Sequence, residues 1–142
     1  MEENFKVLCE QTDEEGQPLE IIRLPLPDDL IYEIDKRDSK FNQIRYYQIK
    51  ENSPVVIEEP ARYILAASYC NYLISNNVIL LPTYYKPGRS SSFKKTDQEA
   101  FNILHKCFPT HKIIQINPEP INAGGGGMNC ISNEQPIYGS KK

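Results

Sequence analysis

The sequence predicts a mixed α/β (α+β) domain. Residues 96–108 carry one clear amphipathic helix pattern, and short apolar runs of strand-like composition lie on either side of it. The chain has 142 residues, of which 39% are hydrophobic and 25% charged, which is typical of one soluble domain with one core. We therefore expect residues 1–142 to form a single unit built from a few short strands and helices.

The N-terminal part predicts a helix followed by a strand. Residues 1–11 carry apolar side chains at spacings of three and four, which suits a short helix ending before an acidic turn. Residues 19–25 then have strand composition, and Pro25 and Pro27 close that strand because proline has no N–H to donate to a ladder.

Residues 28–60 predict a long loop-rich insertion. They are charged and rich in tyrosine, and they show no sustained apolar period. A connection of this length is unusual inside a compact domain and is typical of functional or disordered segments.

Residues 62–82 predict a β-hairpin. Strand-like runs at 62–74 and 78–82 flank Ser75-Asn76-Asn77, which are residue types that tolerate tight turns. Asn71 interrupts the first run, and a buried amide must be satisfied either by neighbouring backbone or by a ligand. We favour backbone.

The helix is expected to begin at a capping box, Thr96-Asp97-Gln98-Glu99, and to end before Pro109. Its apolar face consists of residues at helical spacing, namely Ala100, Phe101, Leu104, Cys107 and Phe108. Residues 111–116 supply the next strand, and residues 117–120 break it before a glycine run.

Composition excludes several classes of protein. No apolar run approaches the roughly 20 residues of a membrane span, and the acidic N-terminus lacks the features of a secretory signal, so we expect a cytoplasmic protein with no membrane partner. The net charge is −3 and no long basic block occurs, so nucleic acid is not expected as a partner. The basic residues between Lys86 and Lys95, and Lys141-Lys142, are interpreted as solvated loop or tail charge.

No metal site is expected. Cys9, Cys70, Cys107 and Cys130 are too far apart for any C-x-x-C pair, and free thiols are the default in a reducing cytoplasm. His105 and Cys107 face different directions on a helix and Pro109 separates both from His111, so surface histidines and a core cysteine are favoured over zinc ligands.

The run Gly124-Gly125-Gly126-Gly127 is the most unusual feature of the chain. Four glycines allow close backbone approach, which suggests that a ligand or a neighbouring chain segment needs the room. No G-K-[ST] follows and the Rossmann spacing fails, so a nucleotide site is not expected. Cys130 lies three residues after the run. From the residues alone it is either an exposed nucleophile or, more commonly, a small buried hydrophobe.

Five blocks in order resemble the C-terminal part of agmatine deiminases and bacterial-type peptidylarginine deiminases, which belong to the pentein, or guanidino-group-modifying, superfamily. The blocks are residues 62–72, 77–82, 97–100, 108–109 and 125–132. Residues 19–27 resemble the strand that precedes them in that family. The resemblance covers most of the chain.

The resemblance implies a partial pentein fold, about two of the five ββαβ modules, and a small guanidino substrate, either agmatine or an arginine side chain, with no cofactor. It implies that Cys130 is the nucleophile and that Gly126, Gly127 and Asn129 contribute to substrate binding. The covalent chemistry would convert a guanidinium to a ureido group and ammonia through an amidino-cysteine.

The chain departs from the family at the partners of the nucleophile. It contains no His-x-Asp motif, and Asn129 stands where the family commonly has histidine directly before the cysteine. We therefore expect a C-terminal portion of a deiminase that is inactive alone and that self-associates or pairs with a complementing N-terminal segment. The alternative is a non-catalytic binding or interaction domain on the same half-core.

Overall fold

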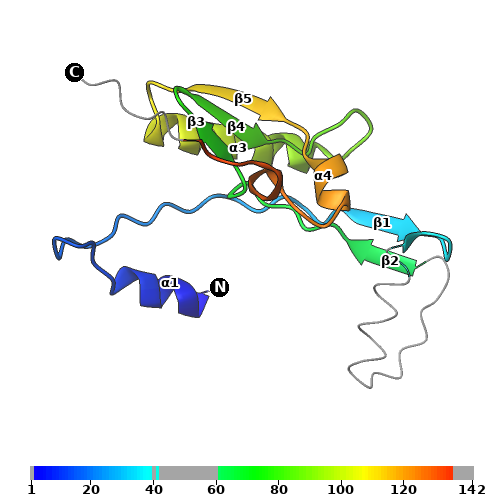
Figure 1. Cartoon of the computed structure of the whole chain (residues 1–142), viewed down its shortest axis with the longest axis horizontal. Helices are drawn as coiled ribbons and strands as arrows, with labels where there is room; N and C mark the ends of the chain where they lie inside the picture. The colour runs from blue at the N-terminus through cyan, green and yellow to red at the C-terminus, as the bar shows by residue number, and fades with distance from the viewer. Residues whose placement is uncertain (1, 40, 42–60, 136–142) are drawn as a thin grey trace.

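The computed structural model describes residues 2–39, 41 and 61–135, and its elements are shown in Figure 1. In chain order they are α1 (Glu2–Cys9), β1 (Ile31–Ile34), β2 (Ala61–Ile64), β3 (Leu73–Ser75), β4 (Val78–Pro82), α3 (Ser91–Cys107), β5 (Lys112–Ile116), α4 (Glu119–Ala123) and the 3-10 helix η1 (Met128–Ile131). The predicted mixed α/β class is confirmed. None of the helices in this part of the chain is long and apolar enough to cross a membrane.

A three-stranded sheet with the order β3-β4-β5 forms the centre of the fold. β3 and β4 are antiparallel, and the turn between them places Asn76 at φ 51°, a left-handed conformation that asparagine tolerates. β4 and β5 are parallel, so a crossover is required, and α3 provides it. The order β3, β4, α3, β5 is one complete ββαβ unit.

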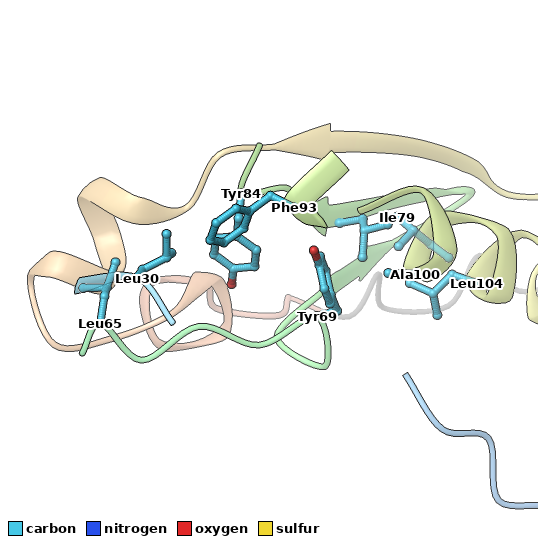
Figure 2. Packing of buried hydrophobic residues seen from close by; sticks show 9 residues of the cluster. Leu30, Leu65, Tyr69, Ile79, Tyr84, Phe93, Ala100 and Leu104 are labelled. Carbon is cyan, nitrogen blue, oxygen red and sulfur yellow. The ribbon is translucent and has the colours of Figure 1, made fainter. Parts of the chain in front are cut away.

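The main core lies between α3 and one face of this sheet (Figure 2). Ile79 and Leu81 of β4 are fully buried, and Ala100 and Leu104 of α3 are buried with them. The predicted apolar face of the helix is thereby confirmed. Phe93 of α3 belongs to the same core, and the remaining buried members come from irregular segments around the sheet, namely Leu30, Leu65, Tyr69 and Tyr84.

A second, two-stranded ladder pairs β1 with β2 in antiparallel register, with Ile31 opposite Ile64. The prediction of loop structure for residues 28–60 is wrong at β1. Four residues are too short a run to reveal a strand when its partner lies about thirty positions away. Residues 42–60 of that predicted insertion lie outside the described residues.

The predicted hairpin is present, but its first strand is not continuous over residues 62–74. β2 ends at Ile64 and β3 begins at Leu73, because the two strands belong to different sheets. The stretch between them is held by side chains instead: the Tyr84 hydroxyl accepts from Ser68 N at 2.9 Å and donates to Ser68 O at 3.2 Å.

The helix α3 begins at Ser91 rather than at the predicted capping box. The Ser90 hydroxyl accepts from Ser92 N at 3.3 Å and caps the helix. Thr96 therefore lies inside the helix, where its Oγ1 donates back to the carbonyls of the preceding turn. The helix ends at Cys107, before Pro109, as predicted.

The predicted strand at residues 19–25 is wrong. Within the described residues, this region contains only an isolated bridge between Thr12 and Pro18. Leu19, Ile22 and Leu26 are between 43% and 56% exposed, so no partner strand covers them. The helix predicted before this segment is confirmed as α1, which contains no buried residue.

The break predicted at residues 117–120 is partly replaced by α4. Pro118 caps this short helix and Pro120 lies in its first turn, where proline loses no hydrogen bond. The glycine run begins directly after α4, and η1 follows the glycine run (Figure 1).

Candidate functional site

Cys130 lies in η1 as an exposed free thiol. Its backbone N–H donates to Gly127 O at 3.0 Å, which closes the turn behind it. A Cβ built on Gly126 would lie 3.1 Å from Cys130 Cβ, a tight contact, and 3.6 Å from Sγ, an ordinary one, so the absence of a side chain at Gly126 avoids crowding the Cys130 side chain. Of the two possibilities that the sequence left open, burial as a small hydrophobe does not describe Cys130.

The four residues predicted for this site lie together because they share one turn. Gly126 and Gly127 precede η1, and Asn129 and Cys130 lie within it. Gly125 has φ 93°, a left-handed conformation that favours glycine. Cys130 and Asn129 are both exposed, whereas Gly127 is buried.

A neighbouring segment occupies the room that the glycines create. Asn71 Oδ1 accepts from Asn129 N at 3.0 Å, across 58 positions of sequence. A Cβ built on Gly127 would lie 1.6 Å from Asn71 Nδ2 and 2.4 Å from Asn71 Cγ, so no side chain fits there. Of the two occupants that the sequence left open, a chain segment uses this space, and the expected backbone partner is found for the Oδ1 of Asn71.

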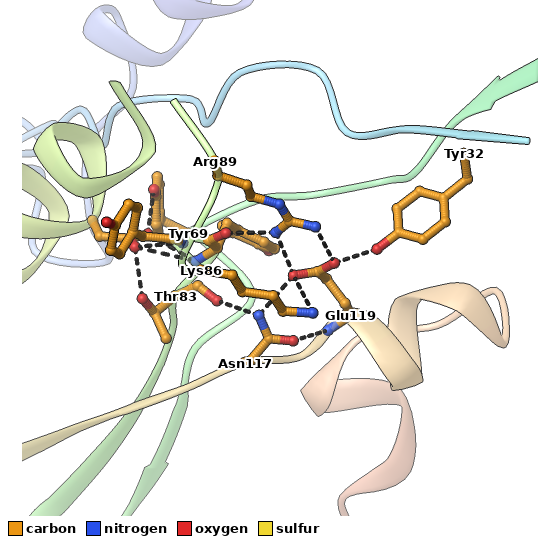
Figure 3. Close-up of polar contacts among 10 residues, drawn as sticks. Tyr32, Tyr69, Thr83, Lys86, Arg89, Asn117 and Glu119 are labelled. Carbon is orange, nitrogen blue, oxygen red and sulfur yellow. Dashed lines mark hydrogen bonds and ion pairs between the residues drawn. The ribbon is translucent and has the colours of Figure 1, made fainter. Parts of the chain in front are cut away.

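A second polar cluster, centred on Glu119, was not predicted (Figure 3). Glu119 is only 3% exposed. Arg89 donates to both of its carboxylate oxygens, from Nη1 to Oε1 at 2.6 Å and from Nη2 to Oε2 at 2.7 Å. Asn117 Nδ2 donates to Oε1 at 2.7 Å, Lys86 Nζ lies 3.2 Å from the same oxygen, and the Tyr32 hydroxyl donates to Oε2. This bidentate geometry is the strongest form of an arginine–carboxylate pair.

The Glu119 cluster shifts the pKa values of its members. Burial alone would raise the pKa of Glu119, but hydrogen bonds from Arg89, Asn117, Tyr32 and Lys86 outweigh it and hold that pKa well below its ordinary value. The hydrogen bond to Glu119 raises the pKa of Arg89. Burial, followed by the hydrogen bond to Glu119, raises the pKa of Tyr32.

The cluster connects three separate parts of the chain. Tyr32 comes from β1, Arg89 and Lys86 from the loop after β4, and Glu119 from the first turn of α4. The interpretation of the basic residues after Lys86 as solvated charge is wrong for Arg89, whose side chain is 23% exposed and paired. No local pattern marks these residues, because the hydrogen-bonded partners are 30 and 87 positions apart.

A third cluster surrounds the buried carboxylate of Asp97 on α3. It accepts hydrogen bonds from the Tyr69 hydroxyl at 2.7 Å, from Thr83 Oγ1 at 2.6 Å, and from the backbone N–H groups of Tyr84 and Tyr85 at 2.9 Å each. Burial is the main cause that raises the pKa of Tyr69. Thr83, Tyr84 and Tyr85 form the segment that leaves β4, and Tyr69 lies in the stretch before β3. Asp97 therefore joins both segments to α3, which is a structural role.

The histidines and cysteines do not converge. Within residues 2–39, 41 and 61–135, no group of three His, Cys, Asp or Glu side chains could hold a metal ion. The four cysteines are free thiols, and Cys107 is half-buried on the apolar side of α3.

Acid should weaken the fold through Glu119. Its pKa in the folded protein is lowered from an ordinary value of 4.5. The stability that the cluster contributes is therefore fully present above pH 4.5 and is lost as the pH falls from that value through the folded-state pKa. We expect the urea midpoint to fall steeply from about pH 4.5 to about pH 3, and less steeply in Glu119→Gln. Glu99→Gln, at an exposed position of α3, is the control; equal slopes for wild type and Glu119→Gln would contradict this assignment.

Comparison with known proteins shows the family to which this chain belongs. Residues 1–136 match the Porphyromonas-type peptidyl-arginine deiminase family, and the chain belongs to that family. A Marinomonas sp. (strain MWYL1) protein whose name assigns it to the agmatine deiminases is 37% identical over 93% of this chain. The agmatine deiminases of Medicago truncatula and Pseudomonas aeruginosa (strain LESB58) are 30% and 31% identical over 95% and 93% of it.

The chain spans about a third of the length of these curated relatives, between 31% and 32%. Among solved structures, one assigned to an agmatine deiminase superposes with a TM-score of 0.60 and 26% identity, covering 93% of this chain and 29% of that one. The agmatine deiminase of Enterococcus faecalis superposes with a TM-score of 0.58 at 23% identity, covering 92% of this chain and 30% of that one. The predicted partial pentein fold is confirmed by these neighbours.

Proposed function

We propose that residues 1–142 form the nucleophile-bearing, C-terminal portion of a guanidine deiminase, with Cys130 as the nucleophile. The observation that supports this most directly is the state of Cys130: within a chain of the deiminase family, it is an exposed free thiol on a turn that bonds to Asn71, where Gly127 leaves room for the Asn71 amide. A nucleophilic thiol has to be accessible and fixed in position.

The proposed reaction has two stages. The thiolate of Cys130 adds to the guanidinium carbon, and the C–N bond to one terminal nitrogen breaks after that nitrogen gains a proton, so that ammonia leaves and an amidino-cysteine remains. Water then adds to the same carbon and loses its protons, the C–S bond breaks, and the thiolate returns as the ureido product forms. Gly126, Gly127 and Asn129 are proposed to form the wall of the substrate site beside the thiol.

The partners of this nucleophile have to come from elsewhere. The sequence has no His-x-Asp motif to move protons, and the exposed turn presents Asn129 beside Cys130 rather than a histidine. We propose that the isolated chain is inactive and that a complementing N-terminal segment, or self-association, supplies the missing groups. We place this chemistry in the cytoplasm, because four free cysteines suit a reducing compartment. Whether agmatine or an arginine side chain is bound depends on groups contributed by that partner.

Turnover assays test the first part of the proposal. The isolated chain is incubated with agmatine and with a peptidyl arginine, and ammonia and ureido product are measured. We expect no turnover. Turnover that disappears in Cys130→Ser would overturn the proposed need for a complementing segment while supporting Cys130 as nucleophile.

Site-resolved labelling tests the nucleophile itself. We expect 2-chloroacetamidine, whose amidinium resembles the substrate, to label Cys130 faster relative to neutral iodoacetamide than it labels Cys9, an exposed thiol in the same chain. Mass spectrometry of the peptides gives both rates, and Cys130→Ser identifies the labelled site. Equal preference at both cysteines would contradict the proposal and favour a non-catalytic binding domain on the same half-core.

A further inference from the structure

Asn71 is the only residue far away in sequence that bonds to the turn carrying Cys130, among the hydrogen bonds of the described residues that involve residues 127–131. It lies in the irregular stretch between β2 and β3, two residues before β3 begins. Its Oδ1 accepts from Asn129 N at 3.0 Å, and Asn129 directly precedes the thiol residue. Asn71 therefore connects the central sheet to the turn that presents Cys130.

The contact depends on the absence of a side chain at Gly127. A Cβ there would lie within 3 Å of three Asn71 side-chain atoms, at 1.6, 2.4 and 2.9 Å. Gly127 is buried against the amide, so the amide and the glycine fit as a pair. A turn that follows four glycines is costly to order, since glycine loses more conformational freedom on ordering than any other residue, and the hydrogen bond to Asn71 offsets part of that cost.

Apolar burial also anchors the turn, because Met128, the first residue of η1, is only 5% exposed. The thiol itself is exposed and lies beside Gly126, where an added Cβ would come within 3.6 Å of Sγ. The bond from Cys130 N to Gly127 O is local to the turn and moves with it. The burial of Met128 and the bond from Asn129 N to Asn71 therefore both tie this turn to the rest of the fold, and the bond acts on the backbone directly beside the thiol residue.

We propose that Asn71 is a positioning residue for Cys130: by accepting from Asn129 N above Gly127, it holds the thiol in the place where a guanidinium carbon would be attacked. This proposal rests on the function proposed above. Asn71 does not touch the reacting atoms, and it acts through the backbone of the turn.

Two variants separate the hydrogen bond from the shape of the side chain. Asn71→Leu keeps the volume and removes the acceptor, whereas Asn71→Asp keeps both the shape and the acceptor oxygen. Asn102→Leu, at an exposed position of α3, is the matched control. The melting temperature of each variant shows whether the domain is folded.

The first measurement is amide hydrogen exchange at residues 127–131 in the full 142-residue chain. Loss of one hydrogen bond is expected to speed exchange of the Asn129 and Cys130 amides by roughly tenfold in Asn71→Leu, with near wild-type exchange in Asn71→Asp and Asn102→Leu. Unchanged exchange in folded Asn71→Leu would overturn the proposal, whatever Cys130 does chemically. If Asn71→Leu does not fold, the comparison of Asn71→Asp with wild type decides: faster exchange in Asn71→Asp would overturn the proposal and unchanged exchange would support it.

The second measurement is the preference of Cys130 for 2-chloroacetamidine over iodoacetamide, referred to Cys9. We expect Asn71→Leu to reduce this preference to the value at Cys9, and Asn71→Asp to restore it. A purely structural role would change the melting temperature and leave the preference intact. No preference in the wild-type chain would contradict the proposed function alone, whereas a preference that survives in Asn71→Leu would contradict only the role of Asn71.

Discussion

Replacing Asp97 with alanine is expected to lower the free energy of unfolding by about 3–5 kcal/mol, a large part of the ~5–15 kcal/mol of a typical domain. The substitution removes the acceptor of two backbone N–H groups, Tyr84 and Tyr85, and of the Thr83 hydroxyl. Each buried donor left without a partner costs roughly 1–3 kcal/mol. Urea unfolding followed by circular dichroism measures the change.

Two further variants make the Asp97 result specific. Asp97→Asn keeps one acceptor oxygen and should fall between wild type and Asp97→Ala. Glu99→Ala, two positions along α3 and exposed, should change stability by less than about 0.5 kcal/mol. A loss of stability as large in Glu99→Ala as in Asp97→Ala would show that helix α3, rather than the hydrogen bonds of Asp97, accounts for the effect.

Arg89→Ala is expected to cost about 3 kcal/mol of stability, because it leaves the buried carboxylate of Glu119 without its bidentate partner. Lys86 remains 3.2 Å away and keeps the loss near the lower end of the range for a broken buried pair. The double variant Arg89→Ala/Glu119→Ala should lose less than the sum of the two single variants, since no unpaired charge remains. The free energies of unfolding of all four proteins complete this cycle.

An exposed ion pair provides the comparison for Arg89. Arg37 and Asp35 form a pair at 3.1 Å, but their side chains are 90% and 59% exposed. Arg37→Ala should therefore change stability by no more than about 1 kcal/mol.

Additive losses of stability in the double-variant cycle of Arg89 and Glu119 would contradict the coupling that the bidentate geometry of Arg89 and Glu119 indicates.

The elements that the sequence predicted best are those whose pattern is local. The apolar face of α3, the turn at Ser75-Asn76-Asn77 and the strand β5 all follow from neighbours within a few residues. The start of α3 was misplaced because Thr96-x-x-Glu99 satisfies the capping-box pattern, while the actual cap is Ser90. A pattern at the right spacing does not show where the helical hydrogen bonds begin.

The strand errors have a different cause. Residues 19–25 and 62–74 both have strand composition, yet a strand also needs a partner, and partners are set by tertiary structure. The first segment has only the Thr12–Pro18 bridge near it, and the second divides between two sheets. β1 was missed for the converse reason: it is short, and its partner β2 lies about thirty residues along the chain.

By itself, the sequence determined the mixed α/β class, the family resemblance and the proximity of the predicted site residues, since Gly126, Gly127, Asn129 and Cys130 are neighbours in the chain. It left open what uses the space above the glycines, and it gave no sign of the clusters around Glu119 and Asp97. Only the tertiary structure decided these, by bringing Asn71 to Asn129 and Arg89 to Glu119 across 58 and 30 positions of sequence. The physical reason is that buried polar groups must find partners wherever the fold places them, and sequence spacing carries no record of those distances.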